Sequence, residues 1–224
     1  PTMTAFNLLR PAPTATATPP NLVSGTGGNH TFTGTAATDT LNYGTLASTQ
    51  ARYTQTNAGW TVHYANSSTT GTDTLSGIER LAFADKTIAL DGLNLESTTG
   101  TVLAVYAAAF NALPNAATLG YWMAQQPSPT PDSTPLARLT TAAQIGLDDY
   151  VPKGVSNEAL VKQLYKNLFG CNADADTVHT FSAQIETGTL SQAQLVALAA
   201  EQFLMRSDYV ELVGQGVAYV PFEG

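Results

Sequence analysis

Few residues in this chain have the types and spacing that catalysis or metal binding requires. The three histidines, His30, His63 and His179, lie far apart, and none has a second histidine or a cysteine at the spacing typical of a metal site. The sequence contains no Gly-x-Ser-x-Gly nucleophile turn, phosphate-binding loop or dinucleotide fingerprint. Because no acid, base or nucleophile has a suitable partner, we expect a protein that is not an enzyme.

Two pairs of carboxylates are the remaining candidates for acid–base chemistry. Asp148 and Asp149 are adjacent in a segment that we expect to be a loop, and Asp174 and Asp176 stand at the expected start of a helix. A carboxylate at a helix N-terminus accepts hydrogen bonds from free backbone N–H groups and stabilises the helix dipole. We therefore interpret the second pair as capping residues and not as catalytic acids.

Aromatic residues offer a different chemistry, the stacking of a sugar ring. Trp60, Tyr64 and Tyr121 are the candidates for surface platforms of this kind. Other aromatic residues recur at helical spacing, which is more typical of a buried core than of a binding surface. These core candidates are Tyr106, Trp122, Tyr165 and Phe181.

Those core candidates belong to a stretch of the C-terminal half that occurs twice, 59 positions apart. Aromatic and aliphatic residues are kept between the two occurrences, whereas polar residues differ. A unit that repeats in this way must bury its apolar face against a neighbour. The matched pairs are Tyr106 with Tyr165, Phe110 with Phe169, Leu119 with Val178, Trp122 with Phe181 and Gln125 with Gln184.

The composition limits the classes of partner. The chain has 224 residues, 9 of them basic and 17 acidic, which gives a net charge of −8, and it has no cluster of Lys or Arg. We therefore expect no nucleic-acid binding. Charged residues make up only 12%, about half of the usual fraction. A polar but weakly charged surface favours a protein that lies outside the cell or against copies of itself.

Cysteine content and hydropathy limit the location further. Cys171 is the only cysteine, so no disulfide can form within the chain. We interpret it as a small, partly buried apolar residue, and the alternatives are a disulfide between chains or a reactive thiol. No apolar run approaches the ~20 residues that span a bilayer, and residues 1–24 lack the pattern of a secretory signal. We expect no insertion into a membrane.

Residues 1–24 are rich in Pro, Thr and Ala, a composition that favours an extended segment without a core of its own. The segment is either a linker or an arm that docks on a neighbouring molecule. An arm would use a few apolar side chains for docking. These are Phe6, Leu8, Leu9, Leu22 and Val23.

Residues 25–95 carry β signals. Apolar and polar side chains alternate on both sides of a turn at 57–59, over residues 51–56 and 60–64. The same alternation occurs on both sides of a second turn, over residues 81–83 and 88–90. Both patterns predict hairpins. The strand pattern places His63 on the solvent side.

Residues 96–224 change to a helical period. We expect helices over 102–113, 116–123, 136–145, 156–169, 175–186 and 191–207, with Asn115, Ser156 and Ser191 as N-caps and residues 125–135 as a loop. A short apolar tail over 210–222 closes the chain. The fold class is therefore predicted to be α+β, with a small N-terminal β module of hairpins followed by an all-α domain built on an internal helical repeat.

Residues 25–42 fit twice a nine-residue frame that begins with Gly25 and with Gly34. The frame resembles the glycine- and aspartate-rich repeats of RTX proteins, which bind calcium and leave bacteria by type I secretion. Residues 71–91 resemble a segment common in those proteins. The helical region is similar to the DUF4214 domain, on the pattern of Leu164, Tyr165 and Phe169 followed by Asp174, Val178 and Phe181.

The resemblance implies an RTX-like β module over residues 25–95, β-roll-like in form, and a DUF4214-like domain over 96–224. It implies calcium held between consecutive turns by carboxylate and backbone oxygens, with Asp39 and Asp73 as the residues of the right type. The chain departs from the family at His30 and Cys171, where aspartate and arginine are expected. The alternative for residues 25–42 is a degenerate roll without calcium, held by Phe32 and Leu41.

These observations predict a noncatalytic secreted or cell-surface structural protein. Such a protein would associate with itself or with the extracellular matrix as a layer, fibre or adhesive coat, and self-association through residues 1–24 is one route. The alternative is a module that binds an extracellular glycan or another ligand within a calcium-dependent type I secreted protein. Both hypotheses place the protein outside the cell.

Overall fold

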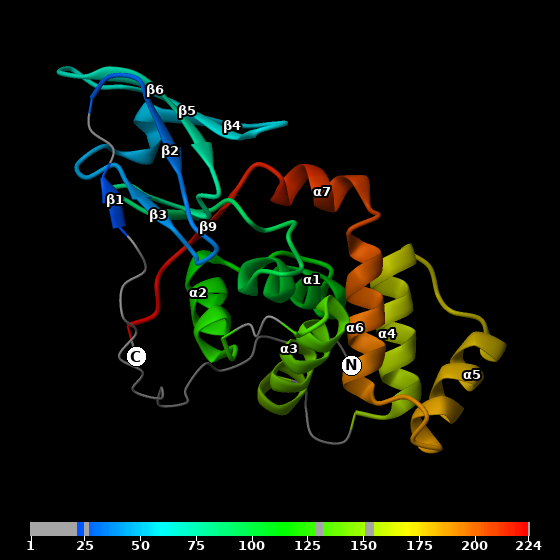
Figure 1. The fold of residues 1–224 in the computed structure, drawn as a ribbon. Helices are drawn as coiled ribbons and strands as arrows, with labels where there is room; N and C mark the ends of the chain where they lie inside the picture. The colour runs from blue at the N-terminus through cyan, green and yellow to red at the C-terminus, as the bar shows by residue number, and fades with distance from the viewer. Residues whose placement is uncertain (1–21, 25–26, 129–131, 151–154, 224) are drawn as a thin grey trace.

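The computed structural model describes residues 22–24, 27–128, 132–150 and 155–223. Two small mixed β-sheets form most of one side of the molecule, and seven α-helices among the described residues form the other (Figure 1). Each part has its own core of buried apolar side chains. The predicted α+β arrangement is confirmed.

The chain visits the two sheets alternately at its start. One sheet has the order β1-β3-β7-β8-β9 and the other the order β2-β6-β5-β4. The first contains β1 (Leu22–Ser24), β3 (Thr40–Asn42), β7 (Arg80–Ala82), β8 (Thr87–Ala89) and β9 (Val217–Tyr219). The second contains β2 (His30–Thr33), β6 (Thr70–Ser76), β5 (Gly59–Ala65) and β4 (Ala51–Thr56). Pairing is parallel for β1 with β3, β2 with β6 and β3 with β7.

Both predicted hairpins are present, as the antiparallel pairs β4–β5 and β7–β8. In β5, Trp60, Val62 and Tyr64 share the buried face, with 7%, 0% and 5% of their surface exposed, and His63 points to solvent as predicted. The Tyr64 hydroxyl donates to the Gly28 carbonyl at 2.8 Å. The prediction that Trp60 and Tyr64 are surface platforms for a sugar is therefore wrong, because alternation turns both rings into the core.

Two glycines allow the turns at the ends of β2 and β6 to touch. A Cβ on Gly34 would lie 1.7 Å from the Gly77 carbonyl oxygen and 2.8 Å from a carboxylate oxygen of Asp39. Gly77 itself has φ +64°, in the left-handed region that other residues adopt only with strain. The close contact between these two turns thus explains glycine at the first position of the second nine-residue frame.

Residues 1–21 and 25–26 lie outside the described residues, so most of the predicted arm cannot be compared with the structure. The end of that segment is described, and it forms β1, an edge strand paired with β3. The β region therefore begins at Leu22, three residues before the predicted boundary at Gly25.

The helices follow the predicted order. They are α1 (Thr98–Phe110), α2 (Ala116–Gln125), α3 (Pro135–Tyr150), α4 (Asn157–Phe169), α5 (Ala175–Glu186), α6 (Gln192–Phe203) and α7 (Ser207–Val213). Ser97 and Ser156 cap α1 and α4, and Asn115 and Asp174 cap α2 and α5. In each case the side chain accepts a hydrogen bond from the backbone N–H three residues later. These paired caps lie 59 positions apart.

Three predictions about the C-terminal half are wrong. Asp148 and Asp149 lie in the last turns of α3 and not in a loop, and the helix expected over 191–207 is α6, which ends at Phe203. The predicted tail forms α7 and then β9, which pairs with β8 and completes the first sheet. The region from residue 96 onward is therefore not all-α, because its end returns to the β module.

A buried ion pair joins the β module to the helices. Arg80, 4% exposed, donates to the carboxylate of Asp91 and, at 2.6 Å, to the hydroxyl of Thr99 in α1. The guanidinium also lies over the ring of Tyr219, 5.6 Å from its centroid. Burial raises the pKa of the Tyr219 hydroxyl. One cation thus holds together β7, the start of α1 and β9.

Candidate functional site

An apolar groove lies between α4, α5 and α6. Its volume is about 240 Å³, and ten residues line it. All of them are apolar or aromatic except Gln202. The lining residues are Val161, Leu164, Tyr165, Leu168, Phe169, Phe181, Leu195, Leu198, Ala199 and Gln202.

The rim of this groove is unusually exposed for apolar surface. Phe169, the last residue of α4, has 60% of its surface exposed, and Leu198 of α6 has 38%. Gly170 ends the helix in the left-handed conformation, and the exposed Cys171 follows. The prediction that Cys171 is partly buried is therefore wrong, since the chain leaves the helix at Gly170 and turns its side chain to solvent.

The matching place in α1, α2 and α3 is closed. Trp122, at the position that matches Phe181, is only 2% exposed. Helix α3 approaches it closely at Gly146, where an added Cβ would lie 2.8 Å from the ring. A glycine at this point allows the backbone of α3 to seal the space that stays open beside α6.

The two sets of helices nonetheless share local geometry. The rings of Tyr106 and Phe110 lie 4.5 Å apart at 45°, and those of Tyr165 and Phe169 lie 4.6 Å apart at 50°. Phe110 is half-buried, whereas its counterpart Phe169 is exposed. The prediction of a buried core thus holds for the first set, but Phe169 belongs to a surface.

Two polar side chains connect the sets next to the groove. Asn167, 5% exposed, donates to the carbonyls of Ala108 and Ala109 at 2.9 and 2.8 Å, which lie in the last turn of α1. Arg206 donates to the Asn167 carbonyl at 2.8 Å and pairs with Asp208. Hydrogen bonds from Arg206 lower the pKa of the Asp208 carboxyl. The orientation of α4 relative to α1 is therefore fixed by hydrogen bonds.

The structure places the two predicted calcium residues in different sheets. Asp39, 1% exposed, precedes β3 and accepts hydrogen bonds from the backbone N–H of Thr35 at 2.5 Å and from its hydroxyl at 2.8 Å. Its own N–H donates to Glu79. Burial raises the pKa of the Glu79 carboxyl, and the hydrogen bond from the Asp39 backbone partly offsets this rise.

Asp73 lies in β6 and is fully buried. Its carboxylate accepts from the Tyr43 hydroxyl at 2.9 Å and from the His30 N–H at 3.2 Å, and the His30 ring lies 3.3 Å away. Burial and the Asp73 charge raise the pKa of Tyr43. Calcium requires six to eight oxygen ligands, and no group of three His, Cys, Asp or Glu side chains is placed to hold a metal within the described ranges. Each of the two carboxylates therefore stabilises a turn or a strand through its own hydrogen bonds.

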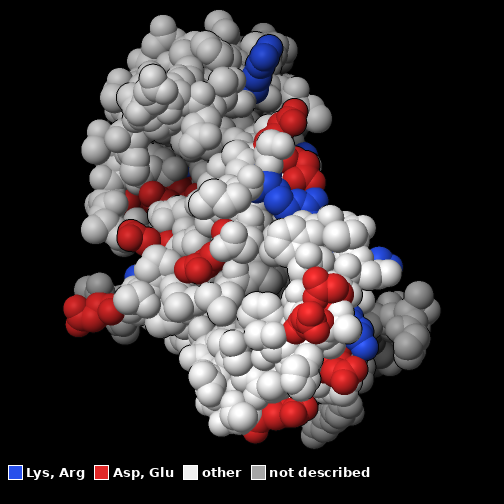
Figure 2. All heavy atoms as spheres, turned by 90° about the vertical axis from the view of Figure 1, so that its right-hand side faces the viewer, with Lys and Arg blue, Asp and Glu red and all other residues white. Residues whose placement is uncertain are grey.

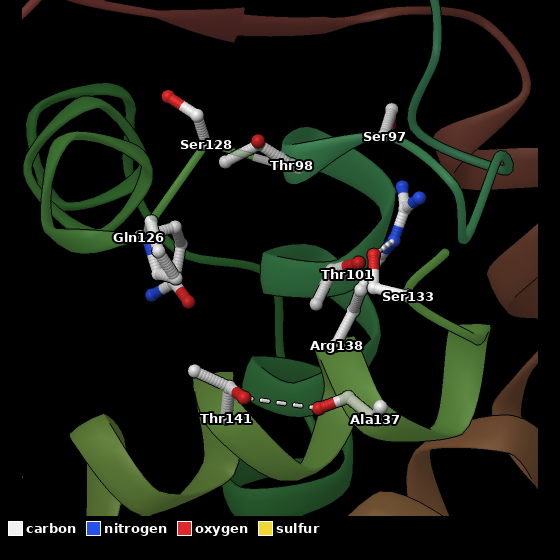
Figure 3. A pocket seen from close by; sticks show the side chains of 10 residues that line it. Ser97, Thr98, Thr101, Gln126, Ser128, Ser133, Ala137, Arg138 and Thr141 are labelled. Carbon is white, nitrogen blue, oxygen red and sulfur yellow. Dashed lines mark hydrogen bonds between the residues drawn. The ribbon is translucent and has the colours of Figure 1, made fainter. Parts of the chain in front are cut away.

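A polar pocket of about 200 Å³ lies between α1 and α3 (Figure 3). Hydroxyl groups from Ser97, Thr101 and Ser133 lie around it, together with Arg138. Arg138 donates to Ser133 at 2.7 Å and to the Glu96 carbonyl, so its charge is used within the fold. Among the described lining residues no acid accompanies this cation, and the pocket offers no acid–base pair.

A larger and more polar cleft of about 810 Å³ runs along the edge strand β4, opposite the loop after α7. Tyr53 of β4 is half-buried there, with its ring 6.3 Å from that of Trp60. Arg52 and Lys86 also line the cleft, and its described lining residues include no acid. The third platform candidate, Tyr121, lies elsewhere and packs edge-on against Phe222.

Charge is sparse on the face seen in Figure 2, where acidic and basic side chains lie singly or in small groups separated by uncharged surface. This pattern agrees with the low charged fraction of the sequence. Within the described residues, no helix is both long and apolar enough to cross a membrane.

Comparison with known proteins yields no match: no family model, curated protein or solved structure matches this chain. The site must therefore be interpreted from its own chemistry. The sequence identified Tyr165 and Phe181 of the groove as core residues, and the opening beside them was not predicted. The signal in the sequence was the replacement of Trp122 by the smaller Phe181 in the second occurrence.

Proposed function

We propose that this chain is a noncatalytic structural protein of the cell surface or extracellular matrix, which associates with copies of itself. The observation that carries the proposal is the open apolar groove with Phe169 at its rim. Burial of apolar surface is favourable by about 25 cal/mol per Å². A concave apolar surface of this kind typically marks a place where another polypeptide binds.

Two further features support the proposal. Strands β1 and β4 lie at sheet edges, where unpaired backbone groups can accept another strand. The low fraction of charged residues also leaves much of the surface free of charges that would have to be desolvated in a contact between copies. Neither feature requires catalytic chemistry.

The finer assignment is a β-roll-like module of an RTX-like protein followed by a DUF4214-like helical domain with an internal repeat. Parallel pairing between strands that alternate between two sheets supports the roll. Helix caps spaced by 59 positions support the repeat. On this assignment the protein reaches the outside of a bacterial cell by type I secretion. Thermal melts with and without a calcium chelator test this assignment. If the fold depends on calcium, the melting temperature should be lower with the chelator.

Self-association is tested by sedimentation velocity over a wide range of protein concentration. The mean mass of the wild type should rise with concentration. Phe169→Ser should remain a monomer with an unchanged melting temperature, because this side chain is already mostly exposed. Met205→Ser is the matched control, since Met205 is 83% exposed and lies outside the groove lining. A wild type that stays monomeric throughout contradicts the proposal.

The cleft along β4 favours a second candidate function, the binding of an extracellular glycan. Its half-buried aromatic ring, Tyr53, and its amide and hydroxyl groups are the chemistry that sugars require. Arg52 and Lys86 would favour a glycan that carries carboxylates. A glycan array tests this candidate with the wild type and with Tyr53→Ala. The wild type should bind one or more glycans, and the substitution should abolish that binding. An array without hits excludes it.

A further inference from the structure

We propose that the groove between α4, α5 and α6 binds the apolar segment at residues 6–9 of a second copy, so that copies join head to tail. The inference rests on the proposed self-association and names the part of the neighbouring molecule that enters the groove. It follows from the chemistry of the groove, from the sequence of the chain outside the described ranges, and from where that sequence enters the fold.

The lining of the groove selects the occupant. Its side chains are aliphatic or aromatic except for Gln202, so a charged or strongly polar segment would lose its hydration there without gaining hydrogen bonds. The volume of about 240 Å³ accommodates a few apolar side chains and not a whole helix or strand. A short segment with closely spaced apolar residues fits these conditions.

The chain contains such a segment. Outside the described ranges, large apolar side chains occur close together only near the N-terminus, where Phe6, Leu8 and Leu9 fall within four residues. The other such stretches are residues 25–26, 129–131, 151–154 and 224, and the largest apolar side chain among them is Val151. No acid or base lies within residues 6–9, and the basic Arg10 follows them directly.

The position of β1 favours binding between molecules. Residues 10–21, twelve in number, separate the apolar segment from β1. Strand β1 lies at one side of the molecule, whereas α4 and α5 lie at the opposite side (Figure 1). A fully extended linker of twelve residues spans at most about 40 Å. An arm that leaves at one side is well placed to meet the groove of the next copy.

This arrangement determines the type of assembly. The arm and the groove are different surfaces, so the contact is heterologous and each copy has both a donor and an acceptor end. A heterologous contact whose rotation does not close produces an open filament. If the rotation closes, the copies form a ring instead, and in both cases the groove is the acceptor site of the head-to-tail contact.

Cys171 makes the inference directly testable, because this single cysteine is exposed and lies two residues beyond Phe169. Asn7→Cys places a second thiol in the apolar segment. Treatment with a short bis-maleimide should then give a ladder of covalent dimers, trimers and longer species on a denaturing gel. The wild type and Asn7→Cys/Cys171→Ser each have one thiol per chain and can give dimers at most.

The result that overturns the inference is equally distinct. Docking of the arm on its own molecule would give an internally linked monomer at every protein concentration. A yield of linked species no greater than that of the single-thiol controls would show that residues 6–9 do not approach the groove. Either outcome contradicts a head-to-tail contact.

Sedimentation separates failure of this inference from failure of the proposed function. The variant Phe6→Ser/Leu8→Ser/Leu9→Ser should be monomeric, and so should Phe169→Ser. Mixed together, they should form a heterodimer and nothing longer, because one working arm and one working groove remain. If the arm variant assembles like the wild type while Phe169→Ser does not, self-association stands and the arm is not the occupant. If the wild type never assembles, both proposals fail.

Discussion

The first set of helices, α1 to α3, and the second set, α4 to α6, begin alike and end differently. Their first helices both have 13 residues, both are capped by serine and both end on a left-handed residue, Asn111 or Gly170. The Tyr–Phe ring pair has nearly the same geometry in each. In the first set, however, α3 seals the aromatic cluster at Gly146, whereas the second set leaves a groove.

This difference shows how one packing unit can keep its local geometry and be closed in one set and open in the other. The caps and ring pair are local features that define each helix, and both sets keep them. The closure depends on the fit of a third helix against the aromatic residue of the second helix. Trp122 fills that space in one set, and Phe181 does not fill it in the other.

The largest expected effect comes from truncating the matched aromatic residues. Trp122→Ala should lower the free energy of unfolding by about 3–5 kcal/mol, because it leaves a cavity in a closed core. Phe181→Ala should cost about 1–2 kcal/mol, since its half-buried ring already borders an open groove. Urea unfolding followed by circular dichroism measures both. Equal losses would contradict the claim that only the first set is closed.

The next effect concerns the contact between the sets. Asn167→Ala should destabilise the fold by about 2–3 kcal/mol, because it leaves two carbonyls of α1 without their buried donor. The neighbouring Lys166→Ala, at an exposed position, serves as the control and should stay within about 0.5 kcal/mol of the wild type. If the two variants unfold at the same urea concentration, Asn167 does not join the sets.

A smaller effect is expected where α3 meets Trp122. Gly146→Ala places a methyl group 2.8 Å from the rigid ring. We expect a net loss of about 1 kcal/mol, because the cost of overpacking exceeds what alanine gains from helix propensity. Gln144→Ala, an exposed substitution in the same helix, is the control. A stabilised Gly146→Ala would show that α3 does not seal the ring closely.

The smallest expected effect is a difference between the caps of α2 and α5 in how their contribution to stability depends on pH. Hydrogen bonds from Thr177 hold the pKa of the Asp174 carboxyl below its ordinary value of 3.8. A depressed pKa contributes stability above the unfolded pKa, and this contribution is lost as the pH falls through the folded value. The melting temperature of the wild type should fall between neutral pH and about pH 2. In Asp174→Asn this fall should be smaller, because the variant lacks the titrating carboxyl.

The reciprocal exchange sharpens this prediction. Asn115 occupies the matching cap of α2 and carries no charge, so its contribution does not depend on pH. Asn115→Asp should add acid sensitivity to the fold, and the double exchange should restore the wild-type profile. Identical acid profiles for all four proteins would show that the cap at Asp174 does not contribute to stability.

The sequence alone predicted those parts of the fold whose signals are local. The caps at Asn115, Ser156 and Ser191 and both hairpins are present, because a cap depends on a few consecutive residues and a hairpin on alternation around a turn. The end of α6 at Phe203 was placed too late, since the apolar period continues past it, and α7 was not predicted. The return of β9 to β8 was also missed, because it joins residues more than 100 positions apart.

The candidate site could be predicted only in part. Spacing identified Tyr165, Phe169 and Phe181 as repeated apolar positions, but periodicity does not tell whether another helix covers them. It likewise did not reveal that Trp60 and Tyr64 face inward, since both faces of a strand can carry aromatic residues. Tertiary packing decides both questions.

Hydrogen–deuterium exchange at low and high protein concentration tests the central claim most directly, because it compares the two sets in one sample. Amides of α4 and α6 should exchange more slowly at high concentration, as the groove is filled by a neighbouring molecule, while those of α1 and α3 should not change. Exchange that is independent of concentration in both sets, or that slows equally in both, would contradict the claim that the second set is completed by another copy of the chain.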